Sequence, residues 1–254
     1  MSAREDFLKQ FRAEPNPHSN IKKIYAIVSG KGGVGKSLVT ALTAITMQKK
    51  GYSCAILDAD VTGPSIPNIF HLTKPLYGTE EGILPKETAS GIKVISANFM
   101  VENPSEAIIW RSPMITSVIK QFYSEVFWGD IDYMFIDLPP GTGDVPLTVF
   151  QSLPLDGIIV VTTPQDLVSM IVEKAIDMAD KMEIPVVGIV ENMSYVLCPD
   201  CGKKISLFHN NDVLVSKYNK IAEIPLDPNL SAACDKGTLE AYPNTYLDAV
   251  AELL

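Results

Sequence analysis

The sequence has few cysteines, an excess of acidic over basic residues and no long apolar run. Four cysteines in 254 residues do not make a disulfide framework. The 21 basic and 30 acidic residues give a net charge of -9, which disfavours sequence-independent binding to DNA or RNA, because that binding needs basic side chains to displace counterions. No apolar stretch reaches the roughly 18 residues that suggest a membrane span. We therefore expect neither a nucleic-acid partner nor a membrane partner.

The first twenty residues also lack the apolar core and the small-residue cleavage site of a secretory signal. We expect a cytoplasmic protein on this ground. The stretch FLKQF is helix-forming and is followed by a Pro-Asn-Pro linker, so residues 1–20 are assigned to an N-terminal extension. The ordinary balance of 46% hydrophobic and 20% charged residues predicts a globular domain, assigned to residues 21–254.

Short apolar runs alternate with helical patterns from Ile24 onward. The predicted strands are Ile24–Ser29, Cys54–Asp58, Ile92–Ala97, Tyr133–Asp137, Gly157–Thr162 and Pro185–Glu191, and the predicted helices include Lys36–Lys50, Pro113–Val126 and Asp166–Met182. Near-continuous apolar strands are typical of parallel sheets buried on both faces. The pattern predicts an α/β fold, a doubly wound and mostly parallel sheet with helices on both sides. Thr62–Glu87 and a CxxC insertion at about 194–211 are predicted to be long irregular loops.

A glycine-rich octet stands between the first predicted strand and the following helix. GKGGVGKS fits the phosphate-loop pattern GxxxxGK[ST] in full. Backbone N–H groups of such a loop and of the first helical turn converge on phosphate oxygens. The expected nucleotide-binding residues are Gly30, Lys31, Gly32, Gly33, Val34, Gly35, Lys36, Ser37 and Leu38. Lys36 is expected to reach the β- and γ-phosphates and Ser37 to bind Mg²⁺, which predicts a magnesium-dependent ATP site.

Three aspartates stand at the ends of predicted strands. Asp58 and Asp60 follow the second strand, and Asp137 ends the strand YMFID. Ligands of open α/β sheets bind at the carboxyl ends of the strands. A single aspartate at such a place is often only a helix cap. Three of them downstream of a phosphate loop favour a role at the nucleotide.

Cys198 and Cys201 form a CxxC in the later irregular segment. Two thiolates can bind one metal from a single turn, but they do not complete a tetrahedral site. His209 is near, yet a single histidine in a polar loop is more often solvated. Two copies of the chain around a twofold axis would supply four thiolates, which suits a bridging [4Fe–4S] cluster or a Cys₄ zinc site. A structural zinc knuckle and an idle surface turn remain alternatives, whereas a thioredoxin-like CxxC normally opens a helix.

The other singled-out side chains are expected to serve packing. Cys54 lies in a predicted buried strand and Cys234 in a predicted helix, and both are interpreted as core or bystander residues. Trp110 and Met193 are likewise expected to pack.

The loop KGGVGKS resembles the deviant Walker A signature of the MinD/ParA/nitrogenase-iron-protein class of ATPases. This resemblance implies ATP hydrolysis, expected to be slow, by a homodimer in which Lys31 contacts the ATP held by the other subunit, much as an arginine finger does. It also implies catalytic roles for Lys36 and for Asp60, which would position the attacking water. Asp58 would hold Mg²⁺ through water. The class usually has Thr where this chain has Leu38.

The same resemblance assigns the remaining nucleotide contacts. Asp137 with the following DLPPGTGD resembles Walker B and switch II, so Asp137 is a further expected magnesium ligand. Asn192 in ENMS resembles the adenine-contacting Asn of the class, and the turn containing Pro225 and Asp227 would lie near the base.

Several segments together resemble the Mrp/ApbC iron–sulfur cluster carriers. These segments are DADVTGPSIP, WRSPM, DLPPGTGD, TTPQ, ENMSY with the following CPDCG, and IPLDP. The resemblance implies ATP-dependent transfer of a cluster to apo iron–sulfur proteins, with Cys198 and Cys201 as cluster ligands. Ser112 stands where the family usually has Gly, and KKISLFHNND lacks the family's Gly-rich continuation.

Two other functions are compatible with the phosphate loop. A MinD/ParA-like regulator of localisation or partitioning, with a structural zinc at the CxxC, is disfavoured by the acidic C-terminal stretch and the net charge of -9. A nitrogenase-like reductase is disfavoured because DLPPGTGD contains no cysteine.

Overall fold

The computed structural model describes residues 12–61, 63, 65–73, 75–100, 112–165, 170–207 and 218–254. Its centre is an eight-stranded sheet in the order β12-β9-β8-β1-β7-β2-β6-β5. The strands are β1 (Asn20–Ser29), β2 (Cys54–Asp58), β5 (Lys86–Glu87), β6 (Lys93–Ser96), β7 (Asp130–Asp137), β8 (Gly157–Thr162), β9 (Val186–Glu191) and β12 (Lys220–Glu223). All neighbouring pairs run parallel except β5 and β6.

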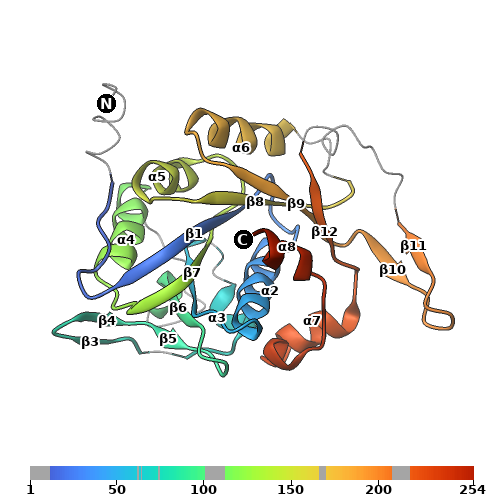
Figure 1. The fold of residues 1–254 in the computed structure, drawn as a ribbon, viewed down its shortest axis with the longest axis horizontal. Helices are drawn as coiled ribbons and strands as arrows, with labels where there is room; N and C mark the ends of the chain where they lie inside the picture. Colours follow the sequence, from blue (N-terminus) through green and yellow to red (C-terminus); the bar gives the residue numbers. More distant parts are fainter. Residues whose placement is uncertain are drawn as a thin grey trace.

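Helices cover both faces of this sheet, as the sequence predicts. Helices α4 (Ser112–Ser124), α5 (Asp144–Ser152) and α6 (Met170–Lys181) lie on one side, and α2 (Lys36–Lys49), α7 (Pro228–Asp235) and α8 (Asp248–Leu253) lie on the other (Figure 1). Among the described residues, no helix is both long and apolar enough to cross a membrane.

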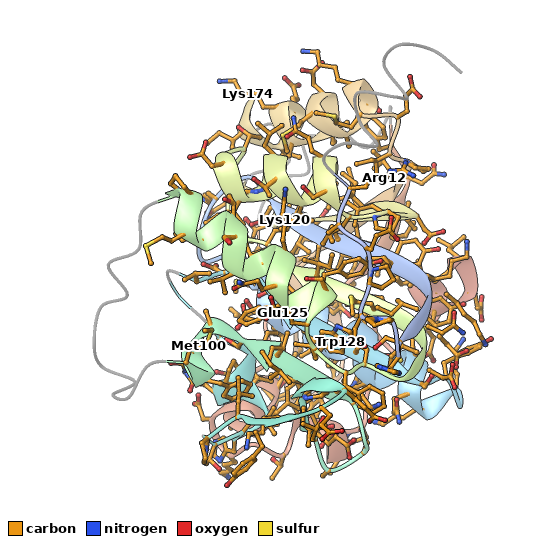
Figure 2. All side chains as sticks on the ribbon, turned by 90° about the vertical axis from the view of Figure 1, so that its left-hand side faces the viewer. Arg12, Met100, Lys120, Glu125, Trp128 and Lys174 are labelled. Carbon is orange, nitrogen blue, oxygen red and sulfur yellow. The ribbon has the colours of Figure 1, made fainter. Side chains whose placement is uncertain are left out.

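The core lies between the sheet and these helices. The side chains of Ile27, Ile56 and Phe135, from three adjacent strands, are fully buried. Trp128 is fully buried beside the end of α4 (Figure 2), and its indole Nε1–H donates to the carbonyl of Phe122 at 3.1 Å. Burial on both faces explains why the inner parts of these strands, after the polar starts of β1 and β7, are almost entirely apolar up to their carboxyl ends.

The six strands predicted from the sequence are confirmed. The prediction that residues 62–87 and 194–211 are irregular loops was wrong, because both contain regular structure. Residues 62–87 contain α3 (Ile66–Ile69), a hairpin of β3 (Tyr77–Thr79) and β4 (Gly82–Leu84), and β5. Residues 194–211 contain a hairpin of β10 (Tyr195–Leu197) and β11 (Lys204–Ser206). These strands are very short and largely exposed, so they show no apolar alternation. The edge strand β12 escaped prediction for a similar reason, because its KIAE side chains are only half-buried.

Some expectations fall outside the described residues. They concern the helix former FLKQF in residues 1–11, Trp110, His209, and the start of the helix predicted from Asp166.

β9 packs closely against β12 and the residue before it, so we expect even a small substitution at Gly188 to lower stability. A Cβ atom at Gly188 would lie 2.5 Å from Ile221 Cγ2 and 2.8 Å from the Asn219 carbonyl oxygen. We expect Gly188→Ala to lower the free energy of unfolding by about 1–3 kcal/mol through overpacking. Gly78→Ala is the control, since a Cβ at exposed Gly78 meets nothing within 4 Å. Denaturant titration measures both variants, and equal stabilities would contradict the packing argument.

Candidate functional site

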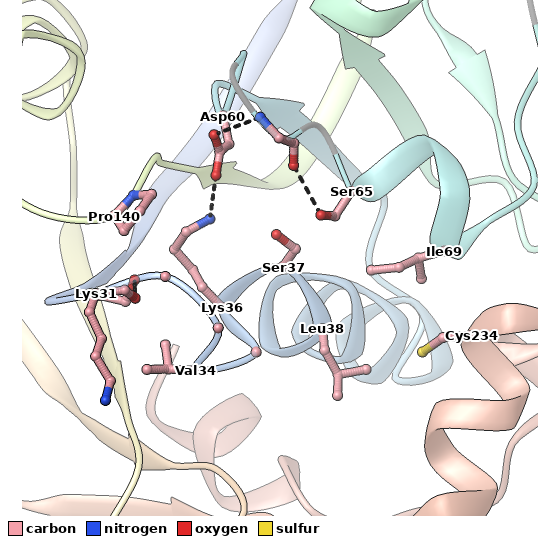
Figure 3. A pocket seen from close by; sticks show the side chains of 15 residues that line it. Lys31, Val34, Lys36, Ser37, Leu38, Asp60, Ser65, Ile69, Pro140 and Cys234 are labelled. Atoms are coloured by element: carbon pink, nitrogen blue, oxygen red, sulfur yellow. Dashed lines mark hydrogen bonds and ion pairs between the residues drawn. The ribbon is translucent and has the colours of Figure 1, made fainter. Parts of the chain in front are cut away.

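The glycine-rich octet connects β1 to α2 at the carboxyl edge of the sheet. Asp137 and Asp58 pair with each other at the ends of β7 and β2, and β1, whose Ile27 pairs with Asp137, continues to Ser29 at the same edge of the sheet. A cavity of about 390 Å³ opens there, lined by residues 31–38 and Ser29 and, across from them, by Asp60, Gly63, Ser65, Ile69, Pro140 and Cys234 (Figure 3). The structure thus brings the predicted phosphate loop and the predicted carboxylates together.

The backbone of the loop requires its glycines. Gly33 and Gly35 have φ values of 82° and 80°, in the left-handed region that favours glycine. A Cβ on Gly30 would lie 2.9 Å from Val172 Cγ2 of α6, so only glycine allows this close approach. No side chain caps the N-terminus of α2, and its first turn has no acidic residue. Such an uncapped terminus presents N–H donors and a positive dipole end to an anion.

Asp137 holds the start of α2. Its Oδ1 accepts from Lys36 Nζ at 2.7 Å and from Thr40 Oγ1 at 2.8 Å, and its Oδ2 accepts from Ser37 Oγ at 2.6 Å. Lys36 Nζ also lies 3.9 Å from Asp60 Oδ2, an ion pair that Figure 3 marks. The expected Mg²⁺ ligands Ser37 and Asp137 are therefore adjacent, and the expected phosphate-binding lysine is between two aspartates.

Asp58 is fully buried beside this cluster. Burial raises the pKa of its carboxyl well above the ordinary value, and the nearby charge of Asp137 raises it further. Its Oδ2 accepts from Ser96 Oγ at 2.9 Å, which favours the charged form. Two neighbouring carboxylates repel each other, and a divalent cation between them would offset this repulsion. Mg²⁺ takes one or two carboxylates and completes its shell with water and phosphate oxygens, so Ser37, Asp58 and Asp137 suit it.

Lys31 and Leu38 line the same cavity but differ in direction from Lys36. Lys31 is exposed, and its side chain points away from Lys36 and Asp60 (Figure 3). Its carbonyl oxygen accepts from Ser29 Oγ at 3.1 Å. Leu38 is half-buried on the wall of the cavity, near Ile69 and Cys234 (Figure 3).

The residues predicted to surround the base are divided between two places. Asn192 is buried against the phosphate loop, and its Nδ2 donates to the carbonyl of Val34 at 2.9 Å. Pro225 and Asp227 instead line a separate groove of about 720 Å³ beside the CxxC hairpin. Asp227 caps α7 by accepting from the Asn229 N–H at 2.9 Å. The base contacts assigned to these residues stay predictions.

The CxxC forms the turn of the β10–β11 hairpin. The Cys198 N–H donates to the Lys203 carbonyl at 2.9 Å, the Gly202 N–H donates to the Cys198 carbonyl at 2.9 Å, and Gly202 has a φ of 69°. Hydrogen bonds from the backbone of Cys201 and then of Asp200 lower the pKa of the Cys198 thiol. Cys201 is exposed and Cys198 half-exposed. A low-pKa thiol in an exposed turn suits metal binding.

The CxxC has no further ligand within the described part of the chain, where no three histidine, cysteine or acidic side chains gather as a metal site. The structure thus leaves both thiols available to an outside ligand set.

Three residues of the site were missed by sequence reasoning. Thr40 holds Asp137 and Ser96 holds Asp58. A threonine one turn after Lys36 in an apolar helix was an available signal for the first, whereas nothing in the sequence pairs Ser96 with Asp58. Cys234 packs against the core, as expected, and it also lies on the cavity wall, which the sequence did not indicate. Cys54 is buried in the core as expected.

Because Asp58 is buried, we expect removal of its charge to raise the free energy of unfolding. Because its folded-state pKa is raised, its charge opposes folding at neutral pH, and this cost disappears as pH falls below the ordinary aspartate value of about 3.9. We expect Asp58→Asn to raise the unfolding midpoint of the nucleotide-free, magnesium-free protein at pH 7. The difference from the parent should shrink at pH 4, as measured by denaturant titration. A variant less stable at pH 7 would contradict this.

The matching family model and two similar proteins have names that refer to iron or to iron–sulfur clusters. A family model described as "ParA: NUBPL iron-transfer P-loop NTPase" matches residues 20–253. An iron-sulfur cluster carrier protein of Clostridium perfringens is 42% identical over 237 residues, which are 89% of this chain and 83% of that protein. Cytosolic Fe-S cluster assembly factor CFD1 of Kluyveromyces lactis is 39% identical over 249 residues, 92% of this chain and 88% of its own.

Solved structures agree with this assignment. A nucleotide-binding protein from Archaeoglobus fulgidus, solved in complex with ADP, has a TM-score of 0.79 and 44% identity, covering 88% of this chain and 90% of that one. The cell division ATPase MinD of Pyrococcus furiosus has a TM-score of 0.64 at 19% identity, covering 91% and 96%, and shows the shared fold. With a complete phosphate loop and a family model spanning nearly the whole chain, the protein belongs to the ParA-type, NUBPL iron-transfer family of P-loop NTPases.

Proposed function

We propose that this protein is an ATP-binding and ATP-hydrolysing carrier that holds an iron–sulfur cluster and transfers it to apoproteins. The observation that carries the proposal is an outward-facing CxxC turn on the same domain as a complete phosphate-loop site. The names of the relatives from Clostridium and Kluyveromyces support it, because both refer to iron–sulfur clusters. The cluster is cargo, and we propose delivery in the cytoplasm without a membrane or nucleic-acid partner.

A second copy of the chain completes the cargo site in this proposal. Cys198 and Cys201 supply two thiolates, and a tetrahedral metal or a [4Fe–4S] cluster requires more ligands. A homodimer with the hairpins at its twofold axis supplies four equivalent thiolates. The half-exposed and exposed positions of these cysteines support such a shared site. Zinc in the same four-thiolate site is the alternative cargo.

The phosphate-loop site provides the parts of a slow ATPase. The uncapped α2 terminus and the loop N–H groups bind the phosphates, and Lys36 leaves Asp137 for the phosphate oxygens. Ser37, Asp58 and Asp137 would hold Mg²⁺, which would supply positive charge beside the phosphates. Asp60, which lines the cavity, orients the attacking water. Lys31 points away from Lys36 and Asp60 of its own site, and we assign it to the ATP of a second subunit.

Removing a CxxC thiol tests the cargo. We expect the parent protein, reconstituted anaerobically with iron and sulfide, to show iron and a visible iron–sulfur absorption. Cys198→Ala and Cys201→Ala should each abolish the bound iron and the absorption. In a symmetric dimer, each substitution removes one thiolate per subunit and therefore two of the four cluster ligands. Metal analysis with a visible spectrum makes the measurement and also identifies zinc.

Cys234→Ala is the matched control for cluster binding, since this cysteine lies on the nucleotide cavity. It should retain the cluster. A parent that binds no iron, or a Cys198→Ala variant that keeps its cluster, would contradict the proposed cargo.

Mixing two inactive variants tests the contact in trans. We expect Lys31→Ala and Lys36→Ala each to lower ATP turnover, roughly 10³-fold for a charge supplied to the transferring phosphoryl group. In a mixed dimer, one site combines an intact Lys36 with the partner's intact Lys31. Equal mixtures should therefore recover about a quarter of the parent turnover, since half the dimers are mixed and each has one complete site. Phosphate release measures this, and a mixture as inactive as its components would contradict a trans role.

A further inference from the structure

Asn192 contacts the phosphate loop and lies in the chain just before the CxxC hairpin. It directly follows β9, whose last residue is Glu191, and it precedes β10, which ends at Leu197 next to Cys198. All residues from Asn192 to Cys198 are described by the structure. The side chain of Asn192 is only 1% exposed, so its contacts are made inside the protein.

The carboxamide of Asn192 holds one particular peptide unit of the phosphate loop. Its Nδ2 donates to the carbonyl of Val34 at 2.9 Å. That carbonyl belongs to the same planar peptide as the N–H of Gly35. Because the two groups point in opposite directions, fixing the carbonyl on Asn192 also fixes the direction of the Gly35 N–H. A Cβ on Gly35 would lie 2.2 Å from Nδ2, so the amide packs directly on the loop.

The chain after Asn192 is held by hydrogen bonds up to the hairpin. Asn192 Oδ1 accepts from the Met193 N–H at 3.0 Å, and Met193 has a φ of 55°, an uncommon value for a non-glycine residue. The Ser194 N–H donates to the Ile224 carbonyl at 3.0 Å. The carbonyl of Tyr195, the first residue of β10, accepts from the Leu226 N–H at 2.8 Å. Hydrogen bonds therefore tie the chain at each step from Asn192 to the first residue of β10.

We propose that Asn192 is a positioning residue that links the Val34–Gly35 peptide of the phosphate loop to the CxxC hairpin. When phosphate binds the loop, the Gly35 N–H turns toward it, the Val34 carbonyl moves with its peptide plane, and Asn192 follows. The hairpin then shifts and changes the exposure of Cys198. The proposal rests on the nucleotide role of the loop given under the proposed function, and it extends that function by naming the connection between nucleotide and cargo site.

Alkylation of the metal-free protein tests this connection without any cluster. The parent for the assay is Cys234→Ser, because Cys234 lines the nucleotide cavity and would respond to nucleotide directly. Iodoacetamide labelling of Cys198, followed by peptide mass spectrometry, gives a rate with and without magnesium–ADP. We expect the two rates to differ by at least about fivefold, the lower range of measured allosteric couplings. Calorimetry establishes the saturating magnesium–ADP concentration for every variant.

Two substitutions on this background interrupt the connection. Asn192→Asp keeps the shape and the acceptor for the Met193 N–H but replaces the donor to Val34 with an oxygen. Met193→Gly removes the side chain that reaches the loop beside Gly35 and loosens the backbone link. At saturating magnesium–ADP, we expect the ratio of rates to fall to about one in both variants. Lys203→Ala is the control in the hairpin, and it should keep the parent ratio.

The outcomes separate this proposal from the cargo assignment. Variants of Asn192 and Met193 that bind nucleotide and keep the parent ratio would overturn the connection, as would a parent ratio of one. Failure of the parent to bind magnesium–ADP would overturn both the connection and the nucleotide role. Absence of iron after reconstitution would overturn the cargo alone, since the alkylation assay contains no metal.

Discussion

The attachment of α2 to the sheet through Asp137 is the contact on which the rest of the site depends. One carboxylate at the end of β7 accepts hydrogen bonds from Lys36, Ser37 and Thr40. Hydrogen bonds to a buried charged group are among the stronger contacts in proteins. Asp137 therefore fixes the helix whose N-terminus faces the phosphates. The same carboxylate repels Asp58, so the contact that positions the loop also makes the neighbouring strand end unfavourable without a cation.

Because Asp58 is buried next to Asp137, the site lowers the folding stability of the protein when no ligand is bound. A buried aspartate without a fully compensating partner costs free energy. Carboxyl groups with a strongly raised pKa are commonly found at functional sites. Ser96 holds Asp58 beside Asp137, where the proposed magnesium ion would bind, although an uncharged side chain would fold there more easily. The proposed magnesium site would account for a buried carboxylate that folding alone does not favour.

The sequence allowed prediction of those parts of the protein whose signals are local. The phosphate loop, the six apolar strands and the aspartates at their ends follow from residue type and spacing, because parallel strands align their carboxyl ends. The β10–β11 hairpin and β12 were not predictable, since their short segments are exposed or only half-buried and are ordered by contacts to distant residues, as between Tyr195 and Leu226 or between β12 and β9. The partners Ser96 and Asp58 are 38 residues apart, and their meeting depends on the strand order. Tertiary contact, not local preference, places these groups.

The central position of β1 has a consequence for synthesis of the chain. Its neighbours in the sheet are β7 and β8, and the Lys36–Asp137 contact joins residues 101 positions apart. Contacts of such long range form late, because the intervening chain must be ordered first. A ribosome therefore has to release more than half of the protein before the phosphate loop meets its carboxylate. Until then the apolar β1 segment is without both neighbours, and exposed apolar strands favour aggregation. Synthesis of the N-terminal half is accordingly the stage at which this strand is most exposed to aggregation.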